Sequence, residues 1–157
     1  MDEHARILVV DDDESIRKIL STILEDEGYS VDTAQDGKEA LERSNREFYN
    51  LALIDVRLPD IEGVVLLTKL RETTPRMRKI IITGFPSIQN AVEAVNNKAD
   101  GYMLKPFDIS KILEMIKEQL KKQQQEKQYD QKRVAEYIET RVRELDTEQI
   151  TQPLHKN

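Results

Sequence analysis

The sequence lacks several features, and each absence removes a class of function. It has no cysteine, which excludes disulfide bonds, thiolate metal sites and a cysteine nucleophile. Its only histidines, His4 and His155, lie near opposite ends, so a histidine metal cluster is not expected. No apolar run is long enough for a signal peptide or a membrane span, and the net charge of −6 gives no general attraction to nucleic acid. We therefore expect a soluble, cytoplasmic protein with no membrane partner.

Up to about Leu120, short apolar runs alternate with segments of helical periodicity, which predicts βα units around a parallel sheet. Residues 29–34 alternate apolar and polar side chains, as an edge strand does. The other strand candidates are uninterrupted and suit strands covered on both faces of a sheet. These four runs are residues 7–10, 51–54, 80–82 and 102–104.

The segments between the runs are predicted to be helices. Apolar residues recur at helical spacing over residues 16–24, and Gly28 follows as a stop signal. Asp36, with Glu39 three residues later, resembles a capping box that opens the second helix. Further amphipathic segments cover residues 65–70, 88–95 and 109–120. The sequence thus predicts an α/β fold of five strands and five helices.

The composition changes after Leu120. Residues 121–128 favour a helix but contain no apolar side chain, so we expect none of them in the core. A weaker apolar stripe returns between Val134 and Leu145. We predict one domain over residues 1–120 and a polar, helical extension or linker over residues 121–157. Three interpretations of the extension stay open: a dimerising helix, a linker to an output domain outside this chain, or a disordered tail.

Polar residues follow four of the five strand candidates. Asp11-Asp12-Asp13 come after the first, Asp55 after the third, Thr83-Gly84 after the fourth and Lys105-Pro106 after the fifth. In a parallel sheet all carboxyl ends lie at one edge, where ligands of open α/β sheets bind. These residues, far apart in the sequence, are therefore predicted to converge.

The converging residues suit phosphoryl transfer. Close carboxylates repel one another by roughly a few kcal/mol per pair, so the cluster favours a cation, and hard oxygen ligands favour Mg²⁺. Asp12 and Asp55 would bind the metal while an Asp55 oxygen attacks phosphorus. Lys105 could pair with Asp55 before transfer and with the phosphoryl group afterwards. Thr83 offers that group a hydroxyl donor.

Each of these residues also has a purely structural explanation. An acidic triplet before a helix is commonly a capping device, and Asp55, followed by Pro59 and Gly63, could be a turn residue. A strand-terminal threonine or lysine is usually structural or solvated. What favours a site is that all four pieces fall at matching strand ends.

Taken together, these motifs resemble the response-regulator receiver family of two-component signalling. The resemblance covers Arg6 to about Leu120. It is carried by Leu8-Val9-Val10-Asp11-Asp12, by Asp55 with Leu58-Pro59 and Gly63, by Ile82-Thr83-Gly84 and by the run from Gly101 to Phe107. It implies a flavodoxin-like receiver fold with sheet order 2-1-3-4-5 and a cis bond at Lys105-Pro106.

The resemblance also implies roles for residues of the site. Asp55 would be the phospho-acceptor and Asp12 a direct Mg²⁺ ligand, with Asp11 acting through water bound to the metal. The backbone carbonyl of Arg57 would complete the protein ligands, while Lys105 and Thr83 would contact the phosphoryl oxygens. The chain would then be a phosphoprotein that assists its own phosphorylation and dephosphorylation, rather than an enzyme.

A switch and its partners follow from the same resemblance. Thr83 and Tyr102 would move on phosphorylation and reshape the surface around the fourth helix, fifth strand and fifth helix; an ordinary half-buried strand aromatic is the alternative for Tyr102. Arg57 and Phe85, two residues beyond Asp55 and Thr83, are expected to tune the phosphate lifetime. The expected partners are a sensor histidine kinase or phosphotransfer protein, an output partner or missing output domain, and a second copy in a homodimer. The extension has no room for a DNA-binding domain with its own core, so direct nucleic-acid binding is not expected.

One alternative belongs to another class. The run Asp11-Asp12-Asp13 also matches the acid-x-acid motif of haloacid-dehalogenase-like phosphohydrolases, in which Asp11 would be the nucleophile and Asp13 the general acid. Such an enzyme needs a further acidic metal motif after its lysine strand, whereas one helix and a polar tail follow Lys105. It would also leave Asp55 without a role.

Overall fold

The computed structural model describes residues 4–84 and 87–151, with 88–90 and 149–151 described by their backbone alone. Strands and helices alternate along the chain. The strands are β1 (Arg6–Val10), β2 (Ser30–Ala34), β3 (Leu51–Asp55), β4 (Arg78–Thr83) and β5 (Gly101–Leu104). The helices are α1 (Glu14–Asp26), α2 (Gly37–Arg46), α3 (Gly63–Lys69), α4 (Ile88–Asn96) and α5 (Ile109–Thr151).

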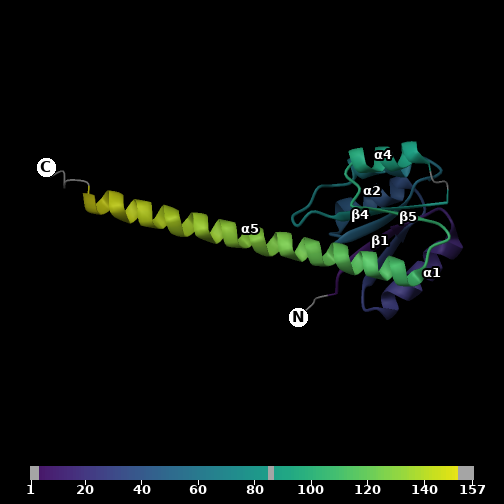
Figure 1. Ribbon diagram of the computed structural model, residues 1–157, viewed down its shortest axis with the longest axis horizontal. Helices are drawn as coiled ribbons and strands as arrows, with labels where there is room; N and C mark the ends of the chain where they lie inside the picture. Colours follow the sequence, from purple (N-terminus) through teal and green to yellow (C-terminus); the bar gives the residue numbers. More distant parts are fainter. Residues whose placement is uncertain (1–3, 85–86, 152–157) are drawn as a thin grey trace. The chain divides into compact units, whose positions relative to one another are not determined.

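The five strands form one parallel sheet in the order β2-β1-β3-β4-β5. Figure 1 shows the sheet between α4 on one side and α1 on the other. The predicted fold class and strand order are therefore confirmed. The chain leaves β1 outward to β2, returns to β3 on the other side of β1, and then continues outward. The reversal places the carboxyl ends of β1 and β3 side by side, where ligands of such sheets bind.

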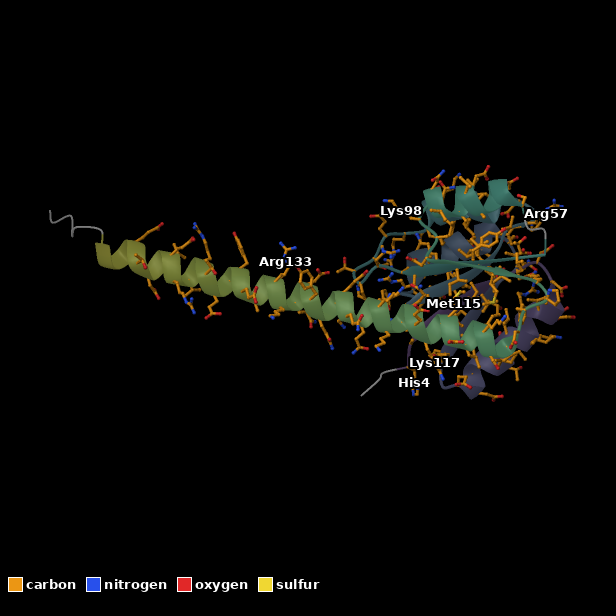
Figure 2. The ribbon with its side chains drawn as sticks, viewed as in Figure 1. His4, Arg57, Lys98, Met115, Lys117 and Arg133 are labelled. Carbon is orange, nitrogen blue, oxygen red and sulfur yellow. The ribbon has the colours of Figure 1, made fainter. Side chains whose placement is uncertain are left out.

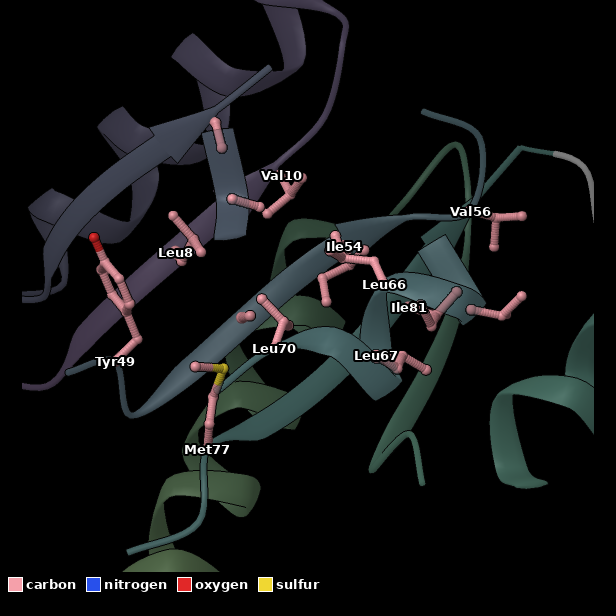
Figure 3. Close-up of a cluster of buried hydrophobic side chains, with 14 of the residues drawn as sticks. Leu8, Val10, Tyr49, Ile54, Val56, Leu66, Leu67, Leu70, Met77 and Ile81 are labelled. Carbon is pink, nitrogen blue, oxygen red and sulfur yellow. The ribbon is translucent and has the colours of Figure 1, made fainter. Parts of the chain in front are cut away.

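Both faces of the sheet are covered by helices. On one face, alternate strand residues such as Leu8, Ile54 and Ile81 pack with residues of α2, α3 and α4 (Figure 3). On the other face, their neighbours pack with α1 and with the first turns of α5. Because successive strand residues point to opposite faces, β1, β3 and β4 contribute to both cores. This explains why their apolar runs are uninterrupted.

Strand β5 departs from this pattern. It forms the second edge of the sheet, as the predicted strand order requires. Its run at residues 102–104 was expected to be covered on both faces. Tyr102 and Met103 do pack against opposite cores, but the coverage is partial: none of the β5 residues is fully buried, and Leu104 is 49% exposed.

Two helix boundaries follow the predicted signals. Gly28 lies just beyond the last turn of α1 with φ of +95°, a backbone conformation that a residue with a Cβ rarely adopts. Asp36 caps α2 by accepting a hydrogen bond from the Glu39 N–H at 2.8 Å. The glycine thus predicted the end of α1, and the capping aspartate predicted the start of α2.

Helix α5 is continuous, and it buries Gln123, a residue that we expected to lie outside the core. Gln123 is only 3% exposed, although nothing after Leu120 was expected to be buried. Its amide nitrogen donates to the carbonyl oxygens of Asn50 at 2.9 Å and Arg76 at 2.7 Å, and its amide oxygen accepts from the Asn50 side chain at 3.1 Å. A polar side chain is tolerated in the interior when its donors and acceptor are satisfied in this way.

The chain divides into two compact units, Met1–Gln123 and Gln124–Asn157. The first, which we call the globular unit, contains the sheet and both cores. In the second, residues 124–151 are helical, and the side chains of residues 124–148 are all exposed. None of the helices in the described part of the chain combines the length and apolar character needed to cross a membrane.

Candidate functional site

The carboxyl ends of β1 and β3 bring three carboxylates together. Val10 is aligned with Ile54 in the sheet, so Asp11 and Asp55, one residue further along, lie next to each other. Oxygen atoms of Asp11, Asp12 and Asp55 all lie within 4.8 Å of one another. The predicted convergence of these carboxylates is therefore confirmed.

Lys105 contributes a cation to this cluster. Strand β5 ends at Leu104, and the Lys105 N–H donates to the carbonyl oxygen of Thr83 at 2.7 Å. The Lys105 ammonium lies 2.8 Å from Asp11 Oδ2 and 3.5 Å from Asp55 Oδ2. The Lys105–Pro106 peptide bond is cis, as the resemblance implied. Four of the predicted residues thus share one site.

The electrostatics of the site follow from burial and close charges. Asp55 is 7% exposed, and burial, followed by the negative charge of Asp11, raises the pKa of its carboxyl above the ordinary value. Burial alone would lower the pKa of Lys105, but its hydrogen bond with Asp11 and the charges of Asp11 and Asp55 raise it. The cluster holds more negative than positive charge, so it favours a further cation.

The donor set suits a hard divalent metal ion. Asp11, Asp12 and Asp55 offer carboxylate oxygens, and Asp12 is exposed on the solvent side of the group. Oxygen ligands with room for water are what Mg²⁺ prefers in proteins. These residues therefore fit the Mg²⁺ that the sequence analysis expected.

The acidic triplet divides into two functions. Asp13 caps α1, because its side chain accepts hydrogen bonds from the N–H groups of Ser15 at 2.8 Å and Ile16 at 3.3 Å. The structural explanation for acids before a helix is thus correct for Asp13. Asp11 and Asp12 instead belong to the carboxylate cluster.

The remaining predicted residues lie around this cluster. Thr83 is the last residue of β4 and is fully buried. Tyr102, in β5, packs against the core on the α4 side, and its hydroxyl is buried without a hydrogen-bond partner among the described residues. Arg57 donates its N–H to Asp55 Oδ1 at 3.5 Å, and its side chain is exposed (Figure 2). Phe85 lies outside the described residues.

Two residues that the sequence analysis did not single out hold the loops of the site. Arg17 donates from its guanidinium to the carbonyl oxygen of Asp11 at 2.7 Å. Asp60 accepts hydrogen bonds from the N–H groups of Gly37 at 2.8 Å and Lys38 at 2.9 Å, which ties the loop after β3 to the start of α2. Neither contact has a sequence signal, since both depend on loop conformation.

Gly63 is required by close packing beside the end of β3. A Cβ at this position would collide with the backbone carbonyl of Asp55, and the Gly63 N–H donates to the carbonyl oxygen of Val56 at 2.6 Å. Helix α3 can therefore begin directly against the end of β3 only because residue 63 has no side chain.

Comparison with known proteins agrees with this arrangement. Residues 7–117 match the family of response regulator receiver domains. The chain is 36% identical over 127 residues to the response regulator ArlR of Staphylococcus saprophyticus, a match that covers 80% of this chain and 56% of ArlR. The chain thus spans about half the length of this relative.

Two solved structures share the fold. One is a CheY-like response regulator receiver domain protein from Methanospirillum hungatei, with a TM-score of 0.76, 45% identity, and coverage of 79% of this chain and 99% of that one. The other is a response regulator from Burkholderia pseudomallei that contains a phosphorylated aspartic acid and a calcium ion. Its TM-score is 0.68 at 32% identity, with coverage of 80% of this chain and 74% of that one.

Proposed function

The chain belongs to the response regulator receiver domain family of two-component systems, and on this premise we propose that Asp55 accepts a phosphoryl group in a Mg²⁺-dependent reaction. The observation that carries the proposal is the position of Asp55 between two other carboxylates and the Lys105 ammonium. The phosphorylated aspartic acid of the Burkholderia relative supports it by analogy.

The donor in this proposal is a phosphohistidine of a sensor histidine kinase or a phosphotransfer protein. An oxygen of the Asp55 carboxylate bonds to phosphorus as the bond between phosphorus and the imidazole nitrogen breaks. The bonding electron pair leaves with the imidazole, and Asp55 becomes an acyl phosphate. Asp11, Asp12, Asp55 and the carbonyl of Arg57 would hold Mg²⁺, which when bound offsets the negative charge of the phosphoryl oxygens.

Lys105 and Thr83 act on the transferred group. Before transfer, Lys105 offsets part of the repulsion between the Asp11 and Asp55 carboxylates. After transfer, its long side chain can pair with a phosphoryl oxygen. Thr83, at the end of the neighbouring strand, donates a hydrogen bond from its hydroxyl to another phosphoryl oxygen. Little further chemistry is needed, because phosphoryl transfer depends mainly on position and charge.

The same two residues link the site to a binding surface. We propose that Thr83 moves toward the phosphoryl group and that Tyr102 follows it, which reshapes the face formed by α4, β5 and α5. The position of Tyr102 supports this, because it lies in β5 beside β4, the strand that ends in Thr83, and packs against the core on the α4 side. The face also carries exposed apolar side chains, namely Val92, Val95, Leu104 and Ile109.

Thr83→Ala tests the switch. The variant should still accept phosphate on Asp55 but should not change the exposure of Tyr102, measured by the change in tyrosine fluorescence on phosphorylation. Thr83→Ser keeps the hydroxyl and should respond like the unaltered chain. An unchanged response in Thr83→Ala would contradict the coupling.

We also propose that Arg57 and Phe85 lengthen the life of the acyl phosphate by hindering the attacking water. The exposed Arg57 side chain lies on the residue whose N–H bonds to Asp55, which supports its part in this. In an Arg57→Ala, Phe85→Ala double variant the phosphate half-life should shorten. An unchanged half-life would count against the proposal, and Arg71→Ala serves as an exposed arginine control.

The partners and the division of the chain complete the proposal. Residues 1–120 would form the receiver domain and residues 121–157 an extension that carries the signal to a second copy, an output partner or an output domain. The greater length of ArlR supports an output beyond these residues. The cytoplasm is the location that a histidine kinase donor requires. As a switch, the chain assists its own phosphorylation and dephosphorylation.

Incubation with acetyl phosphate and Mg²⁺, followed by intact mass measurement, tests the central proposal. The unaltered chain should gain one phosphoryl group and Asp55→Asn should gain none. Asp13→Asn is a matched control, because Asp13 caps a helix beside the site and should not affect the adduct. An adduct that persists in Asp55→Asn and maps to Asp11 would instead support the phosphohydrolase.

A further inference from the structure

The helical segment beyond Gln123 exposes apolar side chains that the receiver chemistry does not use. Val134, Ile138, Val142 and Leu145 are each between 43% and 57% exposed. Single exposed apolar residues are ordinary, but a row of them on one helix indicates a contact surface. The row begins only after a polar stretch of ten residues, 124–133, in which Tyr129 is the single large apolar side chain.

The spacing of the row matches a coiled-coil seam. Ala135, Ile138, Val142 and Leu145 are separated by three, four and three residues, which is the alternation of the a and d positions of a heptad repeat. Val142 occupies an a position and Leu145 the next d position. A β-branched residue at a followed by leucine at d favours a parallel coiled coil of two helices, whereas the preceding pair, Ala135 at a and Ile138 at d, adds no such preference.

The charges beside the seam also favour a parallel pair. In a parallel pair in register, Arg141 at position g faces Asp146 at position e of the partner helix, twice by symmetry. In an antiparallel pair, Glu139 would face an acidic residue, either Glu139 or Asp146, in both possible alignments of the seam. Within one chain Arg141 contacts Glu144 at 3.0 Å. This ion pair is exposed and therefore weak, so Arg141 can exchange it for Asp146 of the partner helix.

The seam is short. Positions a and d before Ala135 are Gln128 and Gln131, and Lys127 would face Lys132 across a parallel pair. The favourable contacts are thus confined to residues 134–148, about two heptads, and helices of this length associate weakly alone. A second contact that brings two copies together raises the effective concentration of the helices to about the millimolar range and makes such a seam useful.

We propose that residues 134–148 pair with the same residues of a second copy as a parallel two-stranded coiled coil. The identity and orientation of the seam follow from this segment alone and do not depend on phosphoryl transfer to Asp55. The extension would thereby give a dimer of defined polarity.

Engineered disulfides test the seam and its orientation, because the chain contains no cysteine of its own. Under mild oxidation, Leu145→Cys should cross-link two full chains, since a parallel seam in register brings the two positions together. Tyr137→Cys, an exposed position off the seam, should not cross-link. Equal cross-linking of both variants, or none in Leu145→Cys at high protein concentration, would overturn the seam.

Sedimentation of the full chain tests the pairing without a covalent bond. Leu145→Asp should weaken dimerisation about tenfold or more, whereas Tyr137→Asp should not. Arg141→Asp alone should weaken it, and adding Asp146→Arg should restore it. Circular dichroism checks that each variant is folded. A dimer that is indifferent to Leu145→Asp would show that other surfaces hold it.

Both measurements are made on the unmodified chain, so they decide whether the seam exists whether or not Asp55 accepts a phosphoryl group. Intact mass of the same samples reports the state of Asp55. Failure of the seam and failure of the proposed function are thereby distinguished.

Discussion

The Lys105 ammonium makes its shorter contact with Asp11, at 2.8 Å. Its distance to Asp55 is 3.5 Å. Lys105 therefore balances two carboxylates and leaves the Asp55 oxygens only partly engaged. This suits a residue that must present one oxygen to phosphorus, because a fully engaged carboxylate is a poorer nucleophile.

Replacing this lysine should separate metal binding from phosphoryl transfer. In Lys105→Met the carboxylates lose their internal cation, so Mg²⁺ should bind about tenfold more tightly. Phosphorylation of Asp55 should nevertheless slow by about 100-fold or more, because a charge that stabilises the transferring group is lost. Calorimetry measures the first effect and intact mass the second. Weaker Mg²⁺ binding would contradict this account, and Lys111→Met is an exposed control.

Replacing Asp12 and replacing Asp13 should change different properties of the chain. Asp13→Ala should lower the free energy of unfolding by about 1 kcal/mol through loss of the α1 cap and leave Mg²⁺ affinity nearly unchanged. Asp12→Ala should do the reverse, with a large loss of Mg²⁺ affinity and little loss of stability. Urea unfolding and Mg²⁺ titration of both variants check this. Parallel effects in the two variants would mean that the triplet acts as a unit.

The buried glutamine of α5 should be a stability determinant. Gln123→Ala leaves the carbonyl oxygens of Asn50 and Arg76 without their donor, which should cost about 1–3 kcal/mol of unfolding free energy. Gln124→Ala changes the adjacent, exposed glutamine and should be nearly neutral. Urea unfolding compares the two. Equal stability would show that Gln123 makes no net contribution.

Asp100 should contribute to the pH dependence of stability. Burial alone would raise the pKa of Asp100, but the hydrogen bonds from Arg76 and the Lys79 N–H lower it below its ordinary 3.8. The unfolded chain therefore takes up this proton first as the pH falls, and stability is lost from near the ordinary pKa down through the folded one.

In Asp100→Asn the chain should be less stable at neutral pH and should lose less stability on acidification below about pH 4. Thermal unfolding across this range measures both effects. Asp130→Asn, at an exposed position, is the control. If Asp100→Asn loses stability on acidification as steeply as the unaltered chain, the pH dependence does not come from Asp100.

Much of the fold could be predicted because its causes are local. The uninterrupted runs of β1, β3 and β4 and the stop at Gly28 depend only on neighbouring residues. The partial exposure of β5 and the burial of Gln123 depend on partners far away in the chain, so local patterns predicted neither. The strand order was predicted correctly, but from the resemblance to a family rather than from periodicity.

Some contacts of the site could likewise be predicted from the sequence, and others could not. The convergence of Asp11, Asp12 and Asp55 follows from strand ends in a parallel sheet, a rule that needs only the strand assignment. The separate capping by Asp13 and the contact of Arg17 with Asp11 depend on the path of the loop after β1. Such contacts have no sequence signature, since many side chains could have reached the same carbonyl.

The packing of Gly63 against Asp55 means that the carboxylate site can be disrupted without replacing any charged residue. A single methyl group at residue 63 would have to push the start of α3 or the end of β3 aside, because the space is already filled by the Asp55 backbone. A screen for inactive variants should therefore recover alanine at this position beside replacements of the carboxylates.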